Sequence, residues 1–512
     1  MTSHLYDLIL GGAAQPEATA LETQDGAVLS YGDLDAGAGR VAQALAALGV
    51  EPGDRVAAQV EKSADAVLLY LGCLRAGAVF LPLNTAYTPS EIGYFLSDAA
   101  PRVFVCDPAR RDALAAIAAA AGVAHVETLD AQGGGSLRRR MDDAAPAAVV
   151  ARGEHDLAAI LYTSGTTGRS KGAMLTHGAL ASNARTLVDY WRFTPADTLI
   201  HALPIYHTHG LFVAINIVLM AGARMLFLPK FDADVVLRLM PRATTLMGVP
   251  TFYTRLLQHD GLTREATARM RLFVSGSAPL LAETHRAWRS RTGHAILERY
   301  GMTETNMNTS NPYDGDRVAG TVGFALPGVA LRIADPVSGA ALPQGEVGMI
   351  EVKGPNVFAG YWRMPEKTAA EFTADRFFIT GDLGMVDERG YVHIVGRGKD
   401  LVITGGFNVY PKEIEGVIDA LPGVEESAVI GLPHPDFGEA VAAVVVRTPG
   451  GAIDEAAITR ALEPRLARFK LPKRVFFVAD LPRNAMGKVQ KNVLRETYAA
   501  TFAPAHSRPP AF

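Results

Sequence analysis

Cysteine is scarce in this sequence of 512 residues, where Cys73 and Cys106 are the only two. Each lies inside an apolar stretch, and neither has Cys or His neighbours at the spacing that a structural zinc site needs. One disulfide between them is an alternative, but two buried thiols in a reducing compartment fit the apolar surroundings better. We therefore expect a cytoplasmic protein that is built on neither disulfides nor zinc.

The sequence also has no long apolar run and no excess of charge. The longest apolar stretch, residues 211–223, is interrupted by Asn216 and is shorter than the roughly 20 residues that span a bilayer, so we expect a buried helix there. Residues 1–11 lack the features of a signal peptide. Lys and Arg number 49 against 53 Asp and Glu, which leaves no electrostatic footprint for nucleic acid or an anionic membrane. We expect neither among the partners.

What the sequence does contain is a regular alternation of short apolar runs with segments of helical length. Helical segments such as 282–291 separate the runs, which are bounded by turn residues. This alternation predicts an α/β fold with layered, partly parallel and buried strands. A chain of this length also exceeds one compact core, so more than one domain is expected. The clearest predicted strands are residues 103–106, 158–162, 272–274 and 349–352.

The pattern changes after about residue 385. Residues 391–395 and 401–404 read as two strands that pair with each other, and Pro411 then opens an amphipathic helix. Further strands are predicted at 427–430, 440–446 and 475–478. We expect an N-terminal domain of residues 1–396, a connection at 397–400 and a small α+β domain of residues 401–512.

The most specific segment is the loop of residues 163–172, which directly follows the strand ending at Tyr162. Its glycines let the backbone approach an anion, its five hydroxyls add donors, and Arg169 and Lys171 add positive charge. A flexible surface loop is the alternative, but this density of donors and cations favours a triphosphate site. It is not a Walker A loop, because Lys171 follows Ser170 rather than Gly.

This loop resembles the signature of the adenylate-forming enzymes, which include AMP-forming acyl-CoA synthetases, luciferases and peptide-synthetase adenylation domains. Other matching segments follow in the family's order, at residues 300–304, 380–382, 396–400 and 484–488. The resemblance covers nearly the whole chain. It implies a large multi-subdomain N-terminal domain with layered α/β sheets and a small mobile α+β C-terminal domain. The implied reaction activates a carboxylic acid with ATP as an acyl-adenylate and passes the acyl group to coenzyme A.

The resemblance also assigns the main catalytic roles. Lys488 matches the catalytic lysine that contacts the acyl oxygen and the α-phosphate, where positive charge must offset two approaching anions. Glu304, with Thr163, is the implied Mg²⁺ ligand, since a hard dication prefers oxygen. The alternative for Glu304 is capping of a helix near Thr303. Thr303 is expected on the α-phosphate and His207 over the reacting carboxylate.

The remaining nucleotide contacts follow from the same resemblance. Asp382 and Arg397 would bind the ribose, and Tyr300 would stack on adenine opposite the wall of residues 276–278. The full set expected to bind ATP and AMP is Thr163, Ser164, Gly165, Thr166, Thr167, Gly168, Lys171, Gly276, Ser277, Ala278, Glu298, Arg299, Tyr300, Thr303, Asp382, Arg397 and Lys488.

Two half-reactions require two arrangements of the chain. In the family the C-terminal domain rotates about one hinge residue, which falls here on Lys399. After that rotation Gly405 and Gly406 would line the tunnel that admits the thiol of coenzyme A. We also expect Lys488 to be a target for a lysine acetyltransferase, because acetylation would remove its charge.

The acid pocket contains arginines where a fatty acid would require apolar residues. Arg255 follows Pro250 on one predicted helix, and Arg286 lies on another. Each taken alone reads as a solvated helix residue. However, the stretches 201–212, 248–257 and 275–310 resemble malonyl-CoA synthetases, in which the matching arginines hold the distal carboxylate, here with Ser277.

We therefore expect malonate and coenzyme A to yield malonyl-CoA, with methylmalonate as a poorer substrate. The alternatives are another short-chain acyl-CoA synthetase, for acetate or a different small diacid, and a non-catalytic nucleotide sensor. A sensor would have no need of Lys488.

Overall fold

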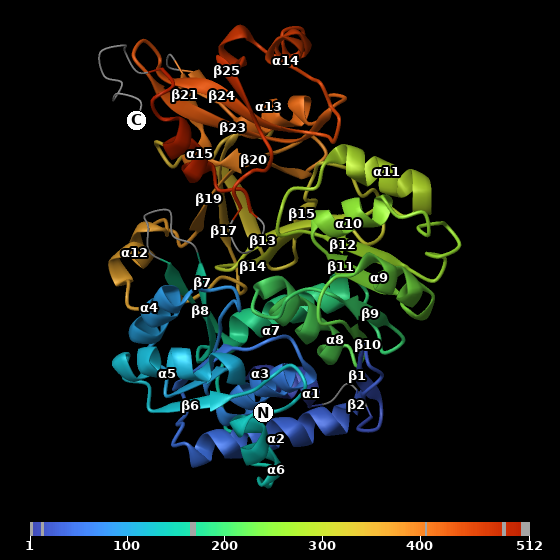
Figure 1. Ribbon diagram of the computed structural model, residues 1–512, viewed down its shortest axis with the longest axis vertical. Coiled ribbons are helices and arrows are strands. Elements are labelled where there is room, and N and C mark those ends of the chain that lie inside the picture. Colours follow the sequence, from blue (N-terminus) through green and yellow to red (C-terminus); the bar gives the residue numbers. More distant parts are fainter. Residues whose placement is uncertain (1–3, 12–14, 164–169, 405–406, 484–487, 503–512) are drawn as a thin grey trace. The chain divides into compact units, whose positions relative to one another are not determined.

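The computed structural model describes residues 4–11, 15–163, 170–404, 407–483 and 488–502. It divides into two compact units. Unit 1 contains Met1–Leu331 and Val352–Phe378, and unit 2 contains Arg332–Glu351 and Ile379–Phe512. Figure 1 shows both units as mixtures of helices and strands, which confirms the predicted α/β class. Among the described residues, every helix is too short or too polar to traverse a bilayer.

One sheet of unit 1 has seven strands in the order β18-β8-β7-β4-β3-β5-β6. Strands β7, β4, β3, β5 and β6 are parallel neighbours, whereas β8 is antiparallel to both β7 and β18. The predicted strands 103–106 and 158–162 are confirmed as β5 and β7. The strands are β3 Arg55–Gln59, β4 Val79–Pro82, β5 Val103–Cys106, β6 His125–Thr128, β7 Leu157–Thr163, β8 Lys171–Thr176 and β18 Gly360–Tyr361.

The helices beside this sheet begin at signals that the sequence carries. Helix α4, for example, begins after Thr88, whose hydroxyl accepts the Glu91 N–H while Glu91 accepts the Thr88 N–H, and Pro89 opens the first turn. These elements are α2 Tyr31–Ala47, α3 Ala64–Ala76, α4 Pro89–Ala99, η1 Pro108–Arg110, α5 Arg111–Ala120, α6 Ser136–Asp142 and α12 Pro365–Ala370.

The second sheet of unit 1 has nine strands in the order β15-β14-β13-β12-β11-β9-β10-β1-β2. Strands β10, β9, β11, β12 and β13 are parallel neighbours. Their carboxyl ends therefore meet at one edge, where open α/β sheets bind ligands. The strands are β1 Thr19–Thr23, β2 Val28–Ser30, β9 Thr198–His201, β10 Arg224–Phe227, β11 Thr245–Gly248, β12 Leu272–Ser275, β13 Leu297–Met302, β14 Asn306–Ser310 and β15 Phe324–Ala325.

The predicted buried helix at 211–223 is present in two parts, a π-helix η2 and the α-helix α8, both buried. A π-helical turn is uncommon and often marks a functional site. The elements beside the nine-stranded sheet are α1 His4–Leu10, α7 His177–Tyr190, η2 His209–Ile215, α8 Asn216–Met220, α9 Ala233–Leu239, η3 Met240–Arg242, α10 Pro250–Leu257 and α11 Ala282–Thr292.

Unit 2 contains two antiparallel-rich sheets. The first has the order β16-β17-β19-β20, and the second has the order β22-β21-β24-β23 with β25 parallel to β24. Its elements are β16 Ala330–Ala334, β17 Gly348–Lys353, β19 Phe378–Val386, β20 Val392–Arg397, η4 Gly398–Asp400, β21 Val402–Thr404, β22 Phe407–Val409, α13 Pro411–Ile418, β23 Val424–His434, β24 Gly438–Arg447, α14 Glu455–Leu462, η5 Arg468–Lys470, β25 Arg474–Val478 and α15 Lys491–Tyr498.

The predicted pairing of strands 391–395 and 401–404 is wrong. Strand β20 pairs with β19, and β21 pairs with β22 and β24. The cause is a tight turn that follows β19, where the Asp387 carboxylate accepts the N–H groups of Arg389 and Tyr391. This short turn brings β19 and β20 together before β21 is reached, since hairpin neighbours need only a few connecting residues.

Asp419 lies just beyond α13 and carries a pH-dependent contribution to stability. Its Oδ1 accepts the Ser427 hydroxyl at 2.6 Å. Burial, together with the nearby Glu415 and Glu426, raises the pKa of Asp419 to about 6. Because folding raises the pKa of this carboxyl, the free energy of unfolding falls as pH rises from the ordinary pKa of Asp to about 6. Above that pH, Asp419 causes no further loss of stability.

We therefore expect Asp419→Asn, which keeps a partner for Ser427, to stabilise the protein at pH 8 by about 1–2 kcal/mol and not at pH 4. The measurement is the midpoint of thermal unfolding at both pH values. An equal gain at pH 4 and pH 8 would contradict the assigned pKa.

Candidate active site

The candidate active site lies where the parallel strands of the nine-stranded sheet end. Strand β11 ends at Gly248 and β12 at Ser275, and these two residues are paired in register. Ser275 is in turn paired with Glu298 on β13. The segments that follow these strands therefore emerge side by side at the carboxyl edge. The predicted residues 276–278 directly follow β12, and the predicted residues 299–304 form the end of β13 and the turn after it.

A hairpin carries the predicted phosphate loop. Thr163 ends β7, Lys171 begins β8, and the two residues are an antiparallel pair. The predicted loop residues Ser164, Gly165, Thr166, Thr167 and Gly168 lie outside the described residues. Thr163 reaches the other predicted segment directly, because its Oγ1 donates to Oε1 of Glu304 at 3.4 Å. Two sequence-distant parts of the predicted set therefore meet.

Glu304 lies on a tight turn between two antiparallel strands. The pair Met302 and Asn306 closes this turn between β13 and β14. Asn306 adopts a left-handed backbone with φ 51°, which Asn tolerates better than most residues. The alternative of a helix beginning near Thr303 is thereby excluded. Glu304 is buried, with 5% of its surface exposed.

Tyr361 and Glu371 complete the surroundings of Lys171 and Glu304. The Nζ of Lys171 lies 3.2 Å from Oε1 of Glu371 and 4.1 Å from the centre of the Tyr361 ring. The Tyr361 hydroxyl lies 2.8 Å from Oε2 of Glu371 and 3.0 Å from Oε1 of Glu304. Burial and both carboxylates raise the pKa of Tyr361, so its hydroxyl stays protonated and donates.

Glu371 stays ionised in this cluster. Burial alone would raise the pKa of Glu371, but hydrogen bonds from Lys367, Tyr361 and Lys171 bring it below its ordinary value. Lys171 therefore has a resident carboxylate partner in this structure. Sequence reasoning missed both Tyr361 and Glu371, since nothing in the local pattern indicates that a segment 200 residues from Lys171 pairs with it.

The same region of the sheet edge contains a buried cation, Arg299. Only 3% of its surface is exposed, and among the described residues its Nε and Nη2 have no hydrogen-bond partner. Burial lowers the pKa of Arg299 to about 9. The Nε and Nη2 groups form the edge of the guanidinium that binds a carboxylate through two parallel bonds. A buried, unpartnered edge of this kind is costly without a ligand.

Gly276 makes room for that guanidinium. A Cβ at position 276 would lie 2.4 Å from Cζ of Arg299. The next residue, Ser277, has a left-handed backbone with φ 69°, which is strained for a side chain other than Gly, Asn or Asp. Such strain commonly accompanies functional sites. Gly276, the first residue of the segment 276–278, therefore lies directly against Arg299.

His209 faces the same region as a neutral imidazole. Its Nδ1 lies 3.3 Å from Oγ of Ser277, and its Nε2 has no partner among the described residues. Burial, the positive charge of Arg299 and two neighbouring histidines hold the pKa of His209 well below its usual range. The Thr208 hydroxyl is also buried and unpartnered within the described part of the chain. Several unmet polar groups in one region indicate a site for a polar ligand.

The other predicted residues of unit 1 take varied positions. Arg255 on α10 and Arg286 on α11 are exposed on their helices. Tyr300 is half-buried, and Ala278 is exposed. The Glu298 carboxylate already has partners within the protein. Its Oε1 lies 3.2 Å from Nδ1 of His285 and accepts the Gly320 N–H at 3.3 Å. His207 and Thr303 are half-buried.

Unit 2 carries the remaining predicted residues. Asp382 and Arg397 are paired in register on β19 and β20, with Oδ1 of Asp382 2.8 Å from Nε of Arg397. Lys399 lies exposed within η4, and Lys488 is exposed. The predicted tunnel residues Gly405 and Gly406 lie outside the described residues.

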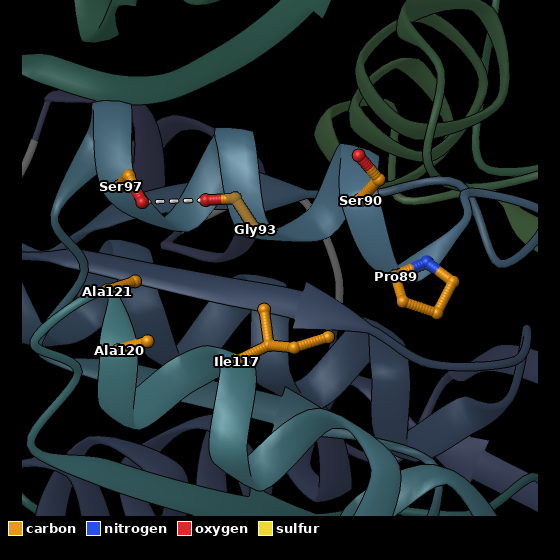
Figure 2. A pocket seen from close by; sticks show the side chains of 7 residues that line it. All are labelled: Pro89, Ser90, Gly93, Ser97, Ile117, Ala120 and Ala121. Atoms are coloured by element: carbon orange, nitrogen blue, oxygen red, sulfur yellow. Dashed lines mark hydrogen bonds between the residues drawn. The ribbon is translucent and has the colours of Figure 1, made fainter.

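A groove of about 380 Å³ between α4 and α5 is a separate feature of unit 1. Figure 2 shows Ser97 and Gly93 on one side, joined by a hydrogen bond of 2.8 Å, and Ile117 on the other. The residues that line it have no ionisable side chain. It therefore offers no charged partner for a phosphate or a carboxylate, and the strand edge remains the candidate site.

Comparison with known proteins agrees with this geometry. A family model described as AMP-binding enzyme matches residues 11–362, and one described as AMP-binding enzyme C-terminal domain matches residues 413–488. A malonate–CoA ligase of Arabidopsis thaliana is 35% identical over 92% of this chain and 85% of that protein. A feruloyl-CoA synthase of an Amycolatopsis species is 37% identical over 94% of this chain and 96% of that protein.

A solved structure extends the similarity to the whole fold. The crystal structure of ATP-bound MatB from Rhodopseudomonas palustris is 66% identical, with a TM-score of 0.96, and the match covers 98% of this chain and 100% of that one. The adenylate-forming motifs, the α/β fold and these matches lead to one conclusion. The chain belongs to the family of AMP-binding enzymes.

Proposed function

We propose that the protein is an ATP-dependent ligase that converts malonate and coenzyme A to malonyl-CoA, AMP and pyrophosphate through a malonyl-adenylate. The observation that carries the choice of acid is the buried Arg299 side chain, whose Nε and Nη2 have no hydrogen-bond partner among the described residues. A diacid keeps one carboxylate free of the reaction, so it can satisfy this edge. The similarity to a malonate–CoA ligase supports the same acid.

In the first half-reaction an oxygen of one malonate carboxylate bonds to the α-phosphorus of ATP, and pyrophosphate leaves. Two anions approach one another, so the side chains must supply positive charge. We assign this role to Lys488, with Thr303 donating to the α-phosphate and His207 beside the reacting carboxylate. Lys171 and the loop that begins at Thr163 bind the leaving phosphates. Lys171 would then exchange its contact with Glu371 for pyrophosphate.

Glu304 and Thr163 fit a Mg²⁺ ion that accompanies ATP. Among the described residues, no three His, Cys, Asp or Glu side chains gather as metal ligands. Mg²⁺ is commonly bound by one or two carboxylates with phosphates and water supplying the rest, so a single carboxylate beside a hydroxyl suits it. When bound, the ion neutralises phosphate charge. Tyr361 orients the Glu304 carboxylate through its hydroxyl.

In the second half-reaction the sulfur of coenzyme A bonds to the acyl carbon, and AMP leaves. For this step we propose an N-terminal domain of residues 1–396, a hinge at 397–400 centred on Lys399, and a mobile domain of residues 401–512. Asp382 and Arg397 would bind the ribose, Tyr300 the adenine, and Gly405 and Gly406 the pantetheine arm.

The structure motivates one change to the expected acid pocket. Sequence reasoning placed Arg299 among the nucleotide contacts and assigned the distal carboxylate to Arg255, Arg286 and Ser277. Arg299 is buried whereas Arg255 and Arg286 are exposed, and a carboxylate gains most from a desolvated partner. We propose that Arg299 and Ser277 hold the distal carboxylate, and that the two exposed arginines attract the dianion toward the site.

Gly276 offers a test that leaves every charge in place. We expect Gly276→Ala to displace the Arg299 guanidinium and to lower kcat/KM for malonate by about 10–100-fold, because a misplaced partner weakens both binding and alignment. The affinity for ATP should change little. The measurement is steady-state kinetics with malonate varied, with ATP binding by calorimetry beside it. An unchanged kcat/KM would contradict the close approach of Arg299 to residue 276.

Malonate-dependent exchange of labelled pyrophosphate into ATP, without coenzyme A, tests the proposed function. Exchange that requires malonate, followed by thioester formation when coenzyme A is added, is the expected result. A nucleotide sensor would show no exchange. Methylmalonate should also react, since one methyl group in a pocket is worth only about 1–3 kcal/mol.

We further infer a cytoplasmic location, because Cys73 and Cys106 are both buried thiols. The exposed Lys488 is also open to a lysine acetyltransferase, and acetylation would remove the charge that adenylation uses.

A further inference from the structure

Lys491 begins α15, three residues after Lys488, and its side chain is largely buried. Its Nζ lies 2.5 Å from Oε1 of Glu415 on α13. The same Oε1 accepts the N–H of Val429 on β23 at 2.9 Å. Glu415 thus joins α13, β23 and α15, and Figure 1 shows α15 beside β23, against which it packs.

The backbone next to Lys488 is bonded to residues 482 and 483, and the Arg483 side chain connects this segment to the same sheet. Arg483 and Val489 form an antiparallel bridge, and the Gln490 N–H donates to the Pro482 carbonyl at 2.7 Å. The Arg483 guanidinium also pairs with Glu426 on β23. Val489, the residue directly after Lys488, is therefore held opposite Arg483.

The Arg483–Glu426 and Lys491–Glu415 ion pairs differ in strength because they differ in burial. The side chains of Arg483 and Glu426 are 38% and 32% exposed, and surface pairs of this kind contribute little. Those of Lys491 and Glu415 are 16% and 7% exposed. Without Lys491, the next cation beside Glu415 in the described residues is Lys412 at 3.7 Å. Loss of one partner from a buried pair is costly, so the Lys491–Glu415 pair is the stronger anchor.

We propose that Lys491 is a positioning residue for adenylation, which acts by anchoring the segment that carries Lys488 to Glu415 and β23. The proposal rests on the role assigned to Lys488. An amine that must contact both the acyl oxygen and the α-phosphate has to be held close to its productive position, and displacement by about 1 Å is enough to lower the rate by about a hundredfold. Thioester formation makes no use of that amine.

The test measures the two half-reactions of the full-length protein separately. Malonyl-adenylate formation is followed in single turnovers with ATP and malonate, and thioester formation with supplied malonyl-adenylate and coenzyme A. We expect Lys491→Met and Glu415→Gln to slow the first step about 10–30-fold and to change the second less than twofold. In Glu415→Gln the amide oxygen can still accept the Val429 N–H, which preserves the packing of α13 on β23. Lys491→Arg should recover most of the lost rate.

A matched control lies on the same helix. Glu413 on α13 forms an ion pair with Lys470 at 2.7 Å, so its partner does not belong to the segment 488–491. Glu413→Gln should leave both half-reactions within twofold of the wild type. Equal losses of both half-reactions in Lys491→Met, or no loss of adenylation in either anchor variant, would overturn the proposal.

Lys488→Ala separates this proposal from the one on which it rests. If Lys488→Ala itself adenylates malonate normally, the role of Lys488 is wrong. If Lys488→Ala fails and Lys491→Met does not, only the anchor is wrong.

Discussion

Lys488→Ala is expected to slow the formation of malonyl-adenylate by at least about a thousandfold, because removal of a charge aimed at the transition state costs several kcal/mol. The reaction of supplied malonyl-adenylate with coenzyme A should stay within about threefold, since no new phosphate bond forms in that step. Rapid-quench measurement of each half-reaction gives both rates.

Lys473 provides the control for this variant. It lies in the same unit, is exposed, and is not assigned to the site. Lys473→Ala should leave both half-reactions unchanged. A loss of the two half-reactions in parallel in Lys488→Ala would mean that the lysine supports the fold or a shared binding step rather than adenylation.

Replacement of Arg299 by methionine is expected to lower kcat/KM for malonate by about a thousandfold, because a carboxylate left in a dry pocket without its cation costs about 3–5 kcal/mol. ATP affinity should change less than threefold. The unliganded variant should also be at least as stable as the wild type, since it loses a buried cation whose Nε and Nη2 have no partner among the described residues. Steady-state kinetics, calorimetry and thermal unfolding measure these three quantities.

Arg299→Lys distinguishes charge from geometry. A lysine keeps the charge but not the planar fork, so only part of the activity with malonate should return. Arg289→Met, on the exposed side of α11, is the matched control and should behave as the wild type. If Arg299→Met instead raised the KM for ATP and spared malonate, Arg299 would belong to the nucleotide site as the sequence first indicated.

Local signals made much of this fold predictable from the sequence. The run 103–106 is apolar throughout and bounded by turn residues, and it is β5 with the predicted bounds. Pro250 and Pro411 each open a helix, as their fixed backbone angle favours. Predictions of this kind succeed because periodicity and capping act over a few neighbouring residues.

One local turn and several contacts between distant segments were not predictable. The pairing of β20 with β19 depends on the turn at Asp387, which the sequence pattern does not distinguish from a loop that leads onward. The contacts of Glu371 and Tyr361 with Lys171 exist only once β18 pairs with β8. For Arg299, the decisive property is the absence of a partner for Nε and Nη2 within the described residues, and no motif reports that.

The choice of acid is tested most directly by one substrate panel. The purified protein receives ATP, Mg²⁺ and coenzyme A with malonate, methylmalonate, succinate, acetate or octanoate, and kcat/KM is measured for each acid. Because only a short diacid presents a second carboxylate to Arg299, malonate should exceed acetate and octanoate by at least about a hundredfold, with methylmalonate second. A preference for acetate or octanoate would contradict the assignment.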